Sequence, residues 1–163
     1  MKTNNQRIET ATFGAGCFWG VQEAYRTLKG VVKTEVGYSG GHLENPTYND
    51  VCTDKTGHAE VVQITFDPAQ VSYEQLLSIF WDNHNPTTLN RQGPDVGAQY
   101  RSVIFYHTEG QQRIAEQSKE GLTKSGRYRS KIVTCLEPAK IFYPAEDYHQ
   151  QYLHKRGLGS CHL

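Results

Sequence analysis

The sequence has no excess of either charge and no long apolar run. Seventeen Lys and Arg residues balance seventeen Asp and Glu residues, and no basic stripe stands out. Electrostatic capture of nucleic acid or of an anionic membrane is therefore not expected, and small, neutral or peptide-like partners are favoured. Because eighteen successive apolar residues occur nowhere, no membrane-spanning helix is predicted. Residues 1–13 lack the apolar run of a signal peptide, so we expect a cytoplasmic protein.

The chain also lacks any Pro/Gly/Ser-rich linker, any abrupt shift in composition and any internal repeat. A length of 163 residues suffices for one well-cored domain, so we expect a single domain over 1–163. We expect this domain to be a monomer.

Cysteines are few, and they form neither a CxxC pair nor a regular framework: Cys17, Cys52, Cys135 and Cys161. In a reducing compartment such cysteines are more often buried thiols or catalytic groups than disulfides. Cys161 and His162 are adjacent, and His149 and His154 fall on different faces of a helix. We therefore expect neither a structural metal site nor a cofactor.

Residue patterning predicts the element order βαββαβ, followed by αβα. Strands are expected at 8–13, 31–38, 58–66, 101–107 and 131–137, and helices at 18–28, 72–84, after Thr108 and at 145–155. Turn-rich stretches at 39–57 and 85–100 read as loops. The first six elements match the split βαβ arrangement, so we expect an α+β fold with a ferredoxin-like βαββαβ core sandwich and C-terminal additions.

Cys17 lies in GAGCFWG, where a strand passes through a tight turn into a helix. At a helix N-terminus, free backbone N–H groups and the macrodipole favour the thiolate and lower a thiol's pKa. Position alone leaves two interpretations open, a nucleophile or an inert buried thiol. Gly14, Gly16 and Gly20 favour the first, because an inert core cysteine needs no close backbone approach.

Glu60 shares its strand parity with Val62, Ile64 and Phe66, so a carboxyl is expected on the apolar face of a strand. Burial there would raise its pKa and keep it protonated, as a proton donor, near neutrality. The alternative is that Glu60 bends into solvent at the strand's frayed start.

Polar side chains in and beside the two loops are further candidates for a ligand site. Tyr38, Tyr48 and Tyr100 either donate hydrogen bonds to a polar ligand atom or act as amphipathic lids over the core. Asp95 either orients such a site or only forms a turn. No spacing selects a histidine as a partner of Cys17; the candidates are His58, His84 and His149.

The remaining cysteines differ in setting. Cys161 lies near the C-terminus in GLGSCHL, and its glycine-rich context suits a resolving cysteine that travels to a distant sulfur. Cys135 has the strand spacing of a small core residue, and Cys52, in the first loop, stays ambiguous.

In order along the chain stand GAGCFWG, GYSGG, NPTY, TGHAEVV, FDP, FWDNHNP, RQGPDVGAQYRS and AEDYHQQYL. With these motifs, spanning about residues 8 to 155, the chain resembles the A-type peptide methionine sulfoxide reductases. The resemblance implies an α+β fold and the thiol-dependent reduction of methionine S-sulfoxide, free or in oxidised proteins, as protein repair under oxidative stress.

The resemblance also implies a role for each residue that matches a family motif. Cys17 corresponds to the nucleophile and Glu60 to the acid. Tyr48 and Tyr100 correspond to the tyrosines that hydrogen-bond the sulfoxide oxygen. The rest of the pocket is an aromatic wall for the substrate's methyl group and a supporting carboxylate: Phe18, Trp19 and Asp95.

The implied cycle leaves a sulfenic acid on Cys17, which a second thiol converts to a disulfide that thioredoxin or a similar dithiol donor reduces. The chain departs from its longer relatives at the tail, where it carries Cys161 alone. A single transfer from Cys17 to Cys161 is therefore expected, with Cys52 as the competitor. Two other classes remain open on the residues alone, a Cys/His hydrolase and a non-enzymatic module that binds oxidised methionine or senses oxidants.

Overall fold

The computed structural model describes residues 7–157 as an α+β structure around a six-stranded sheet of order β7-β6-β1-β3-β2-β8, whose edge strands are β7 (Cys135–Pro138) and β8 (Tyr143–Pro144). The four central strands and the two helices between them are β1 (Glu9–Ala15), α1 (Phe18–Arg26), β2 (Val31–Ser39), β3 (Ala59–Phe66), α3 (Tyr73–Asp82) and β6 (Ser102–Tyr106). All pairings in β6-β1-β3-β2 are antiparallel. This is the ferredoxin-like βαββαβ core that the sequence predicts.

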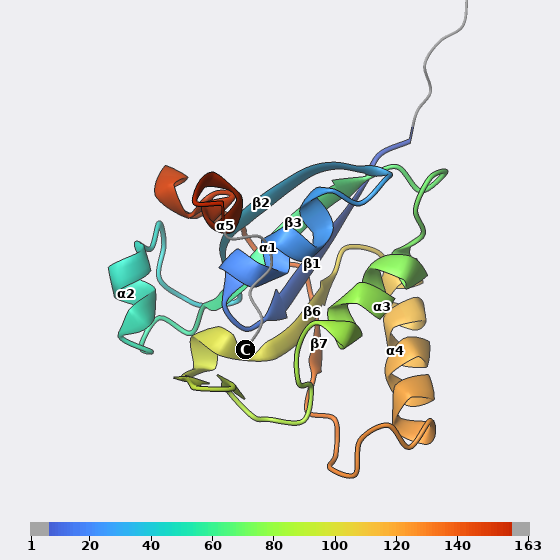
Figure 1. Cartoon of the computed structure of the whole chain (residues 1–163). Coiled ribbons are helices and arrows are strands. Elements are labelled where there is room, and N and C mark those ends of the chain that lie inside the picture. The colour runs from blue at the N-terminus through green and yellow to red at the C-terminus, as the bar shows by residue number, and fades with distance from the viewer. Residues whose placement is uncertain (1–6, 158–163) are drawn as a thin grey trace, which may run out of the picture.

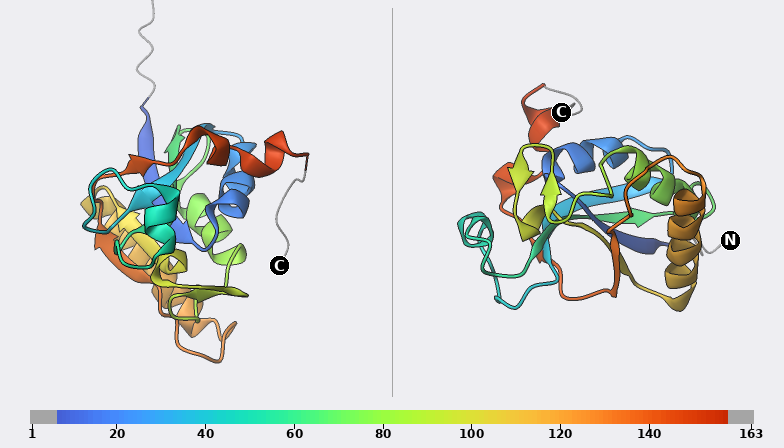
Figure 2. Two further views of the ribbon diagram at one scale, coloured as in Figure 1. Left: turned by 90° about the vertical axis from the view of Figure 1, so that its left-hand side faces the viewer. Right: turned by 90° about the horizontal axis from the view of Figure 1, so that it is seen from below.

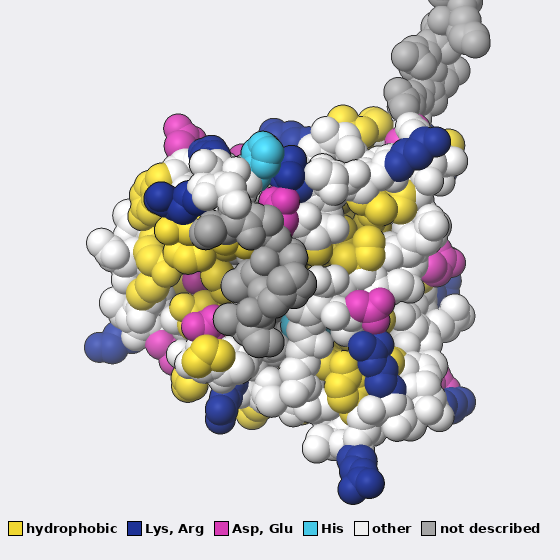
Figure 3. Space-filling view, in the orientation of Figure 1, with side chains coloured by type: hydrophobic (Ala, Val, Ile, Leu, Met, Phe, Trp, Pro, Cys, Tyr) yellow, Lys and Arg dark blue, Asp and Glu magenta, His cyan; other side chains and the backbone are white. Residues whose placement is uncertain are grey.

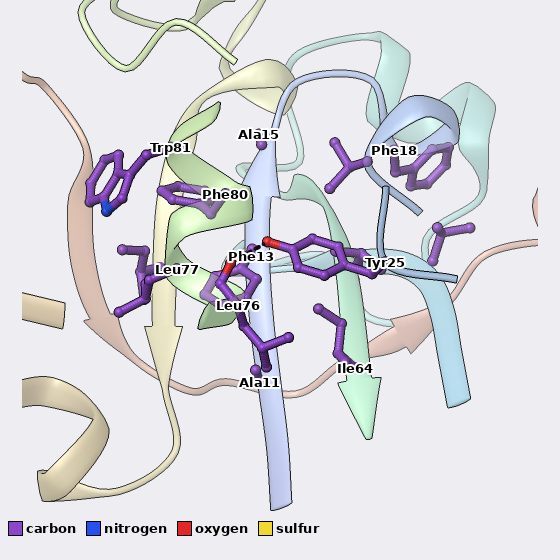
Figure 4. Close-up of a cluster of buried hydrophobic side chains, with 14 of the residues drawn as sticks. Ala11, Phe13, Ala15, Phe18, Tyr25, Ile64, Leu76, Leu77, Phe80 and Trp81 are labelled. Carbon is purple, nitrogen blue, oxygen red and sulfur yellow. Dashed lines mark hydrogen bonds between the residues drawn. The ribbon is translucent and has the colours of Figure 1, made fainter. Parts of the chain in front are cut away.

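Helices α1 and α3 cover one face of this sheet (Figures 1 and 2). Alternate residues of β1 face them, and the buried Phe13 ring stacks with Tyr25 of α1 at 5.8 Å between centroids. Phe13 also lies 5.2 Å from the ring of Phe80 in α3 (Figure 4). Because β1 is pinned beneath both helices, the turn that joins it to α1 has a fixed position.

Helix starts follow the capping signals of the sequence. The Ser72 hydroxyl oxygen accepts a hydrogen bond from the Gln75 N–H, and the Gln75 side-chain oxygen accepts one from the Ser72 N–H, which completes a capping box. Thr108 caps α4 (Glu109–Lys124) through the Gln111 N–H. None of the helices within residues 7–157 is long and apolar enough to cross a membrane.

The last predicted strand is shorter than expected and starts later. β7 (Cys135–Pro138) runs parallel to β6 at the sheet edge, whereas residues 131–134 are outside it. The prediction that Cys135 is a core residue is wrong, because its side chain is exposed. Thr134 faces inward and bonds Ser102 Oγ at 2.7 Å, so the next side chain along the chain points outward.

The predicted single helix at 145–155 is also wrong. After β8 (Tyr143–Pro144), the chain forms a 3-10 turn, η2 (Asp147–His149), and a short helix, α5 (Tyr152–Lys155). The Gln150 amide bonds both the N–H and the C=O of Val36, which draws the backbone out of helical register. Gln151 then adopts φ 52°, and α5 packs against α1.

Both predicted loops contain short elements. The first holds α2 (Tyr48–Cys52), whose Thr47 and Asp50 form a capping box. The second holds a hairpin of β4 (Arg91–Gln92) and β5 (Asp95–Val96), followed by the 3-10 turn η1 (Ala98–Tyr100). These elements bring loop residues of both segments toward the turn between β1 and α1 (Figure 1).

Candidate active site

Cys17 directly precedes α1 and is half-buried. The glycines before it are needed for close packing, as the sequence predicts. Gly16 has φ +92°, and a Cβ there would lie 2.8 Å from Cγ of Gln92. A Cβ on Gly14 would lie 2.7 Å from Cγ1 of Val103. The strand therefore reaches the helix through a turn that larger residues would push apart.

The Glu60 carboxyl lies beside Cys17, buried on the apolar face of β3. Its side chain is 1% exposed, and Oε1 accepts a hydrogen bond from the Phe18 N–H at 3.2 Å. Oε2 is also buried and has no hydrogen-bond partner within residues 7–157. Burial, with a smaller effect of Asp95, raises the pKa of Glu60 to about 8 against the lowering effect of the Phe18 N–H. The predicted burial of Glu60 is confirmed and the solvent-facing alternative is excluded, and the direction of the pKa shift agrees with a protonated carboxyl.

Tyr48 of α2 and Tyr100 of η1 lie in the same electrostatic environment as Glu60. Burial raises the pKa of both phenols, and the charge of Glu60 raises each of them further. Asp95 and Cys17 also act on the pKa of Tyr100. The fold thus brings together five side chains that the sequence separates by up to 83 positions, from Cys17 to Tyr100.

Glu146 holds Tyr48 in place, a function that the sequence did not indicate. Its Oε2 accepts the backbone N–H of Tyr48 at 2.9 Å, and its Oε1 accepts the hydroxyl of buried Tyr38 at 3.0 Å. Burial raises the pKa of Glu146, but hydrogen bonds from Tyr48, from its own backbone and from Tyr38 outweigh it, so the pKa is lowered. Tyr38 is therefore a core residue whose hydroxyl holds Glu146 in place. We call the contacts of Glu146 with Tyr38 and Tyr48 the clamp.

Phe18 and Trp19 form an aromatic wall next to Cys17 with residues of the C-terminal segment. The Trp19 ring stacks on Tyr152 of α5 at 3.7 Å between centroids and 6° between planes. Its Nε1–H donates to Nδ1 of His149 at 2.9 Å, and the His149 ring lies 5.3 Å from Phe18. In Figure 3, hydrophobic side chains gather on this part of the surface, over the region of α2 and α5.

The three candidate histidines bond to groups that hold the fold. His58 Nδ1 accepts the Gly41 N–H, and its Nε2 bonds Leu43 O. His84 Nδ1 donates to Phe80 O, which leaves Nε2 to accept the Ser102 hydroxyl. With His149 bonded to Trp19, each of these imidazoles has a positioning contact, and a Cys/His hydrolase gains no support.

The other cysteines occupy different positions. Cys52 ends α2 as an exposed residue, and its thiol and the Tyr48 hydroxyl act on each other's pKa. Cys161 lies outside the described residues. In the part of the chain that is described, no group of three or more His, Cys, Asp or Glu side chains is arranged to hold a metal ion.

A cavity of about 630 Å³ opens at Cys17. The end of α3 and the β4–β5 hairpin line it, together with Tyr128. Asp95 faces this cavity, and it also raises the pKa of Glu60, which does not itself line the cavity.

Comparison with known proteins shows the family to which the chain belongs. Residues 9–163 match the family model described as peptide methionine sulfoxide reductase. The peptide methionine sulfoxide reductase MsrA of Methanothermobacter thermautotrophicus is 65% identical over 157 residues, which are 96% of this chain and 93% of that protein.

Solved structures of known proteins lead to the same family. Reduced Mxr1 from Saccharomyces cerevisiae has a TM-score of 0.89 at 36% identity, covering 98% of this chain and 92% of that one. Mxr1 in complex with Trx2 has a TM-score of 0.64 at 26% identity, covering 93% and 89%. The chain therefore belongs to the A-type peptide methionine sulfoxide reductases, and it reduces methionine S-sulfoxide to methionine.

Proposed function

We propose that Cys17 and Glu60 carry out the reduction together. The Cys17 thiolate attacks the electrophilic sulfur of the sulfoxide, and Glu60 protonates the departing oxygen. The protonated oxygen then moves from the substrate sulfur to the Cys17 sulfur as the transient bond between the two sulfurs breaks and its electron pair stays on methionine. Cys17 is left as a sulfenic acid, so cysteine sulfur is oxidised as substrate sulfur is reduced. The observation that carries this proposal is the buried Oε2 of Glu60, which has no partner within residues 7–157.

Tyr48 and Tyr100 hydrogen-bond the sulfoxide oxygen in this proposal. Both hydroxyls are protonated at neutral pH, since the ordinary phenol pKa is about 10 and burial raises it further, so each is a donor. Asp95 supports the pocket by raising the pKa of Glu60. Three donors then converge on an oxygen that gains negative charge as the S–O bond breaks.

Phe18 and Trp19 receive the S-methyl group. The stack of Trp19 on Tyr152 and its bond to His149 hold the indole in one orientation. An apolar methyl site beside a hydrogen-bonding oxygen site is chiral, which accounts for the use of one epimer.

Cys161 resolves the sulfenic acid. Its thiol condenses with Cys17 to form a disulfide and water, and a thioredoxin-like dithiol donor reduces that disulfide by thiol exchange. Support for the donor comes from Mxr1, whose complex with Trx2 has been solved. Only three residues lie between Gly157, the last described residue, and Cys161.

The protein acts as a single domain over 1–163 and as a monomer in the cytoplasm, on free methionine S-sulfoxide and on oxidised proteins. Its role there is protein repair under oxidative stress. The balanced charge, with seventeen residues of each sign, fits small or polypeptide partners better than nucleic acid or a membrane surface.

Disulfide mapping tests the resolving role. Prereduced protein receives one equivalent of methionine S-sulfoxide without a donor, and the cysteine pairs are identified by mass spectrometry. We expect a Cys17–Cys161 disulfide in the wild type and in Cys52→Ser, and a persistent sulfenic acid in Cys161→Ser. A Cys17–Cys52 disulfide that forms in Cys161→Ser at the wild-type rate would assign the role to Cys52.

A further inference from the structure

The cavity at Cys17 extends well beyond the reacting thiol. Its volume of about 630 Å³ is that of a small-molecule pocket, about 300 to 1,000 Å³. One wall is the end of α3 at residues 82–85, and the other is the hairpin at residues 92–95, with Tyr128 also in the lining. Figure 2 (right) shows the hairpin standing beside the start of α1. We call this cavity the hairpin groove.

A sulfoxide sulfur at Cys17 has three substituents to place. Its oxygen belongs near the Glu60 carboxyl, and its methyl group belongs against Trp19, as proposed above. The third substituent is the methylene chain that leads to the substrate's main chain, and it needs a third direction. The hairpin groove provides that direction, because Cys17 lies in its lining while Glu60 and Trp19 do not.

We propose that the hairpin groove binds the main chain of an oxidised polypeptide next to the methionine sulfoxide. This inference rests on the proposed function, which fixes the oxygen and methyl sites. Only two methylene groups separate the sulfur from Cα, so the main chain must pass close to Cys17. The occupant is therefore the segment of the substrate protein that is covalently joined to the reacting side chain.

A side-chain contact of Gln92 already holds the two walls of the groove together. Gln92 is 8% exposed, and its amide makes a paired contact with the backbone of Asn85. Its Oε1 accepts the Asn85 N–H at 2.9 Å, and its Nε2 donates to Asn85 O at 2.6 Å. This contact locks the hairpin to the end of α3, so a bound segment meets walls that need little ordering.

The groove separates peptide substrates from the free amino acid. Free methionine S-sulfoxide occupies only the part beside Cys17, whereas a peptide also reaches the distal wall at Tyr128. The opposite face of the hairpin offers a control, since Val96 pairs with Arg91 and Gln92 pairs with Asp95. Residues paired across a hairpin share a face, so Val96 points away from Gln92 and from the groove.

Photo-cross-linking tests the placement. The full chain carrying Cys17→Ser is mixed with a pentapeptide that has methionine S-sulfoxide at its centre and benzoylphenylalanine next to it. We expect cross-links in residues 82–85, 92–95 or Tyr128, displaced by unlabelled peptide. Cross-links confined to α2 or α5, or groove labelling that unlabelled peptide does not displace, would overturn the proposal.

Kinetics supply a second readout. We expect Tyr128→Ala to lower kcat/KM for the pentapeptide about fivefold and to leave that for free methionine S-sulfoxide within about twofold. Val96→Ala, at an exposed hairpin residue, should change neither value. Equal losses on both substrates, or no loss on the peptide, would contradict the groove's role. Methionine release from the free amino acid by the wild type, Cys17→Ser and Glu60→Gln tests the roles of Cys17 and Glu60 separately from the groove.

Discussion

The backbone N–H of Phe18 lies 3.2 Å from Oε1 of Glu60 and donates a hydrogen bond to it, which fixes a buried carboxyl beside the residue that follows Cys17. The same carboxyl has a pKa of about 8, because burial outweighs this hydrogen bond. At neutral pH the group is therefore mainly protonated, with Oε2 buried and unbonded by any described residue. A protonated carboxyl in this position can supply a proton as the S–O bond breaks.

The stability of the fold should depend on pH through Glu60. Between the ordinary glutamate pKa of 4.5 and about 8, the folded state holds a proton that the unfolded state has lost. The free energy of unfolding therefore falls as pH rises through this window, by up to about 1.4 kcal/mol per pH unit from this group. Urea titrations of wild type and Glu60→Gln from pH 5 to pH 9 check this. The variant should gain stability over wild type with rising pH, and parallel curves would contradict it.

Replacement of Glu146 should impair the placement of Tyr48. In Glu146→Gln, either the Tyr48 N–H faces an amide NH₂ and loses its acceptor, or the Tyr38 hydroxyl accepts from that NH₂ and both contacts become neutral hydrogen bonds, which are weaker than those to a carboxylate. We expect kcat to fall about tenfold, about 1.4 kcal/mol of transition-state stabilisation, with a smaller change in KM.

The control for Glu146→Gln is Tyr38→Phe, which removes only the hydroxyl contact and keeps the ring. Its kcat should fall less than that of Glu146→Gln, since the bond to the Tyr48 N–H remains. Equal losses in the two variants, or wild-type kcat in Glu146→Gln, would show that the clamp does not position Tyr48.

Acid should destabilise the protein through His84. Burial lowers its pKa to about 4, from 6.5, against the raising effect of the hydrogen bond to Phe80 O. Between these pH values the unfolded state holds a proton that the folded state lacks, so stability falls as pH falls. The loss is about 3 kcal/mol over the range, at about 1.4 kcal/mol per unit. Urea midpoints of His84→Gln between pH 4 and pH 7 should show a flatter slope than wild type, and an identical slope would refute the assignment.

The strand parity of Glu60 and the glycines around Cys17 made two parts of the site predictable from sequence. Both signals are local, since they depend on residues within a few positions of each other. Glu146 was not predictable, because its partners Tyr38 and Tyr48 are about a hundred residues away and only the sheet brings them together. The same limit explains why the exposure of Cys135 was not predicted, since its outward direction follows from the contact between Thr134 and Ser102.

The βαββαβ core was predictable because its periodicity switches cleanly between strands and helices. The C-terminal segment was not, because the Gln150 amide replaces helical hydrogen bonds with bonds to Val36. Sequence periodicity over residues 145–155 records a helical preference, and this tertiary contact overrides it.

Single-turnover kinetics with methionine S-sulfoxide, without a donor, test the central claim that Cys17 attacks while protonated Glu60 donates. Prereduced wild type, Cys17→Ser and Glu60→Gln are compared from pH 6 to pH 10, and released methionine is measured. We expect about one equivalent from wild type, at a rate that declines above pH about 8 as Glu60 loses its proton. Cys17→Ser should release none, and Glu60→Gln should be about 10² to 10⁴ times slower, without that decline. Full release from Cys17→Ser, or a wild-type rate in Glu60→Gln, would contradict the account.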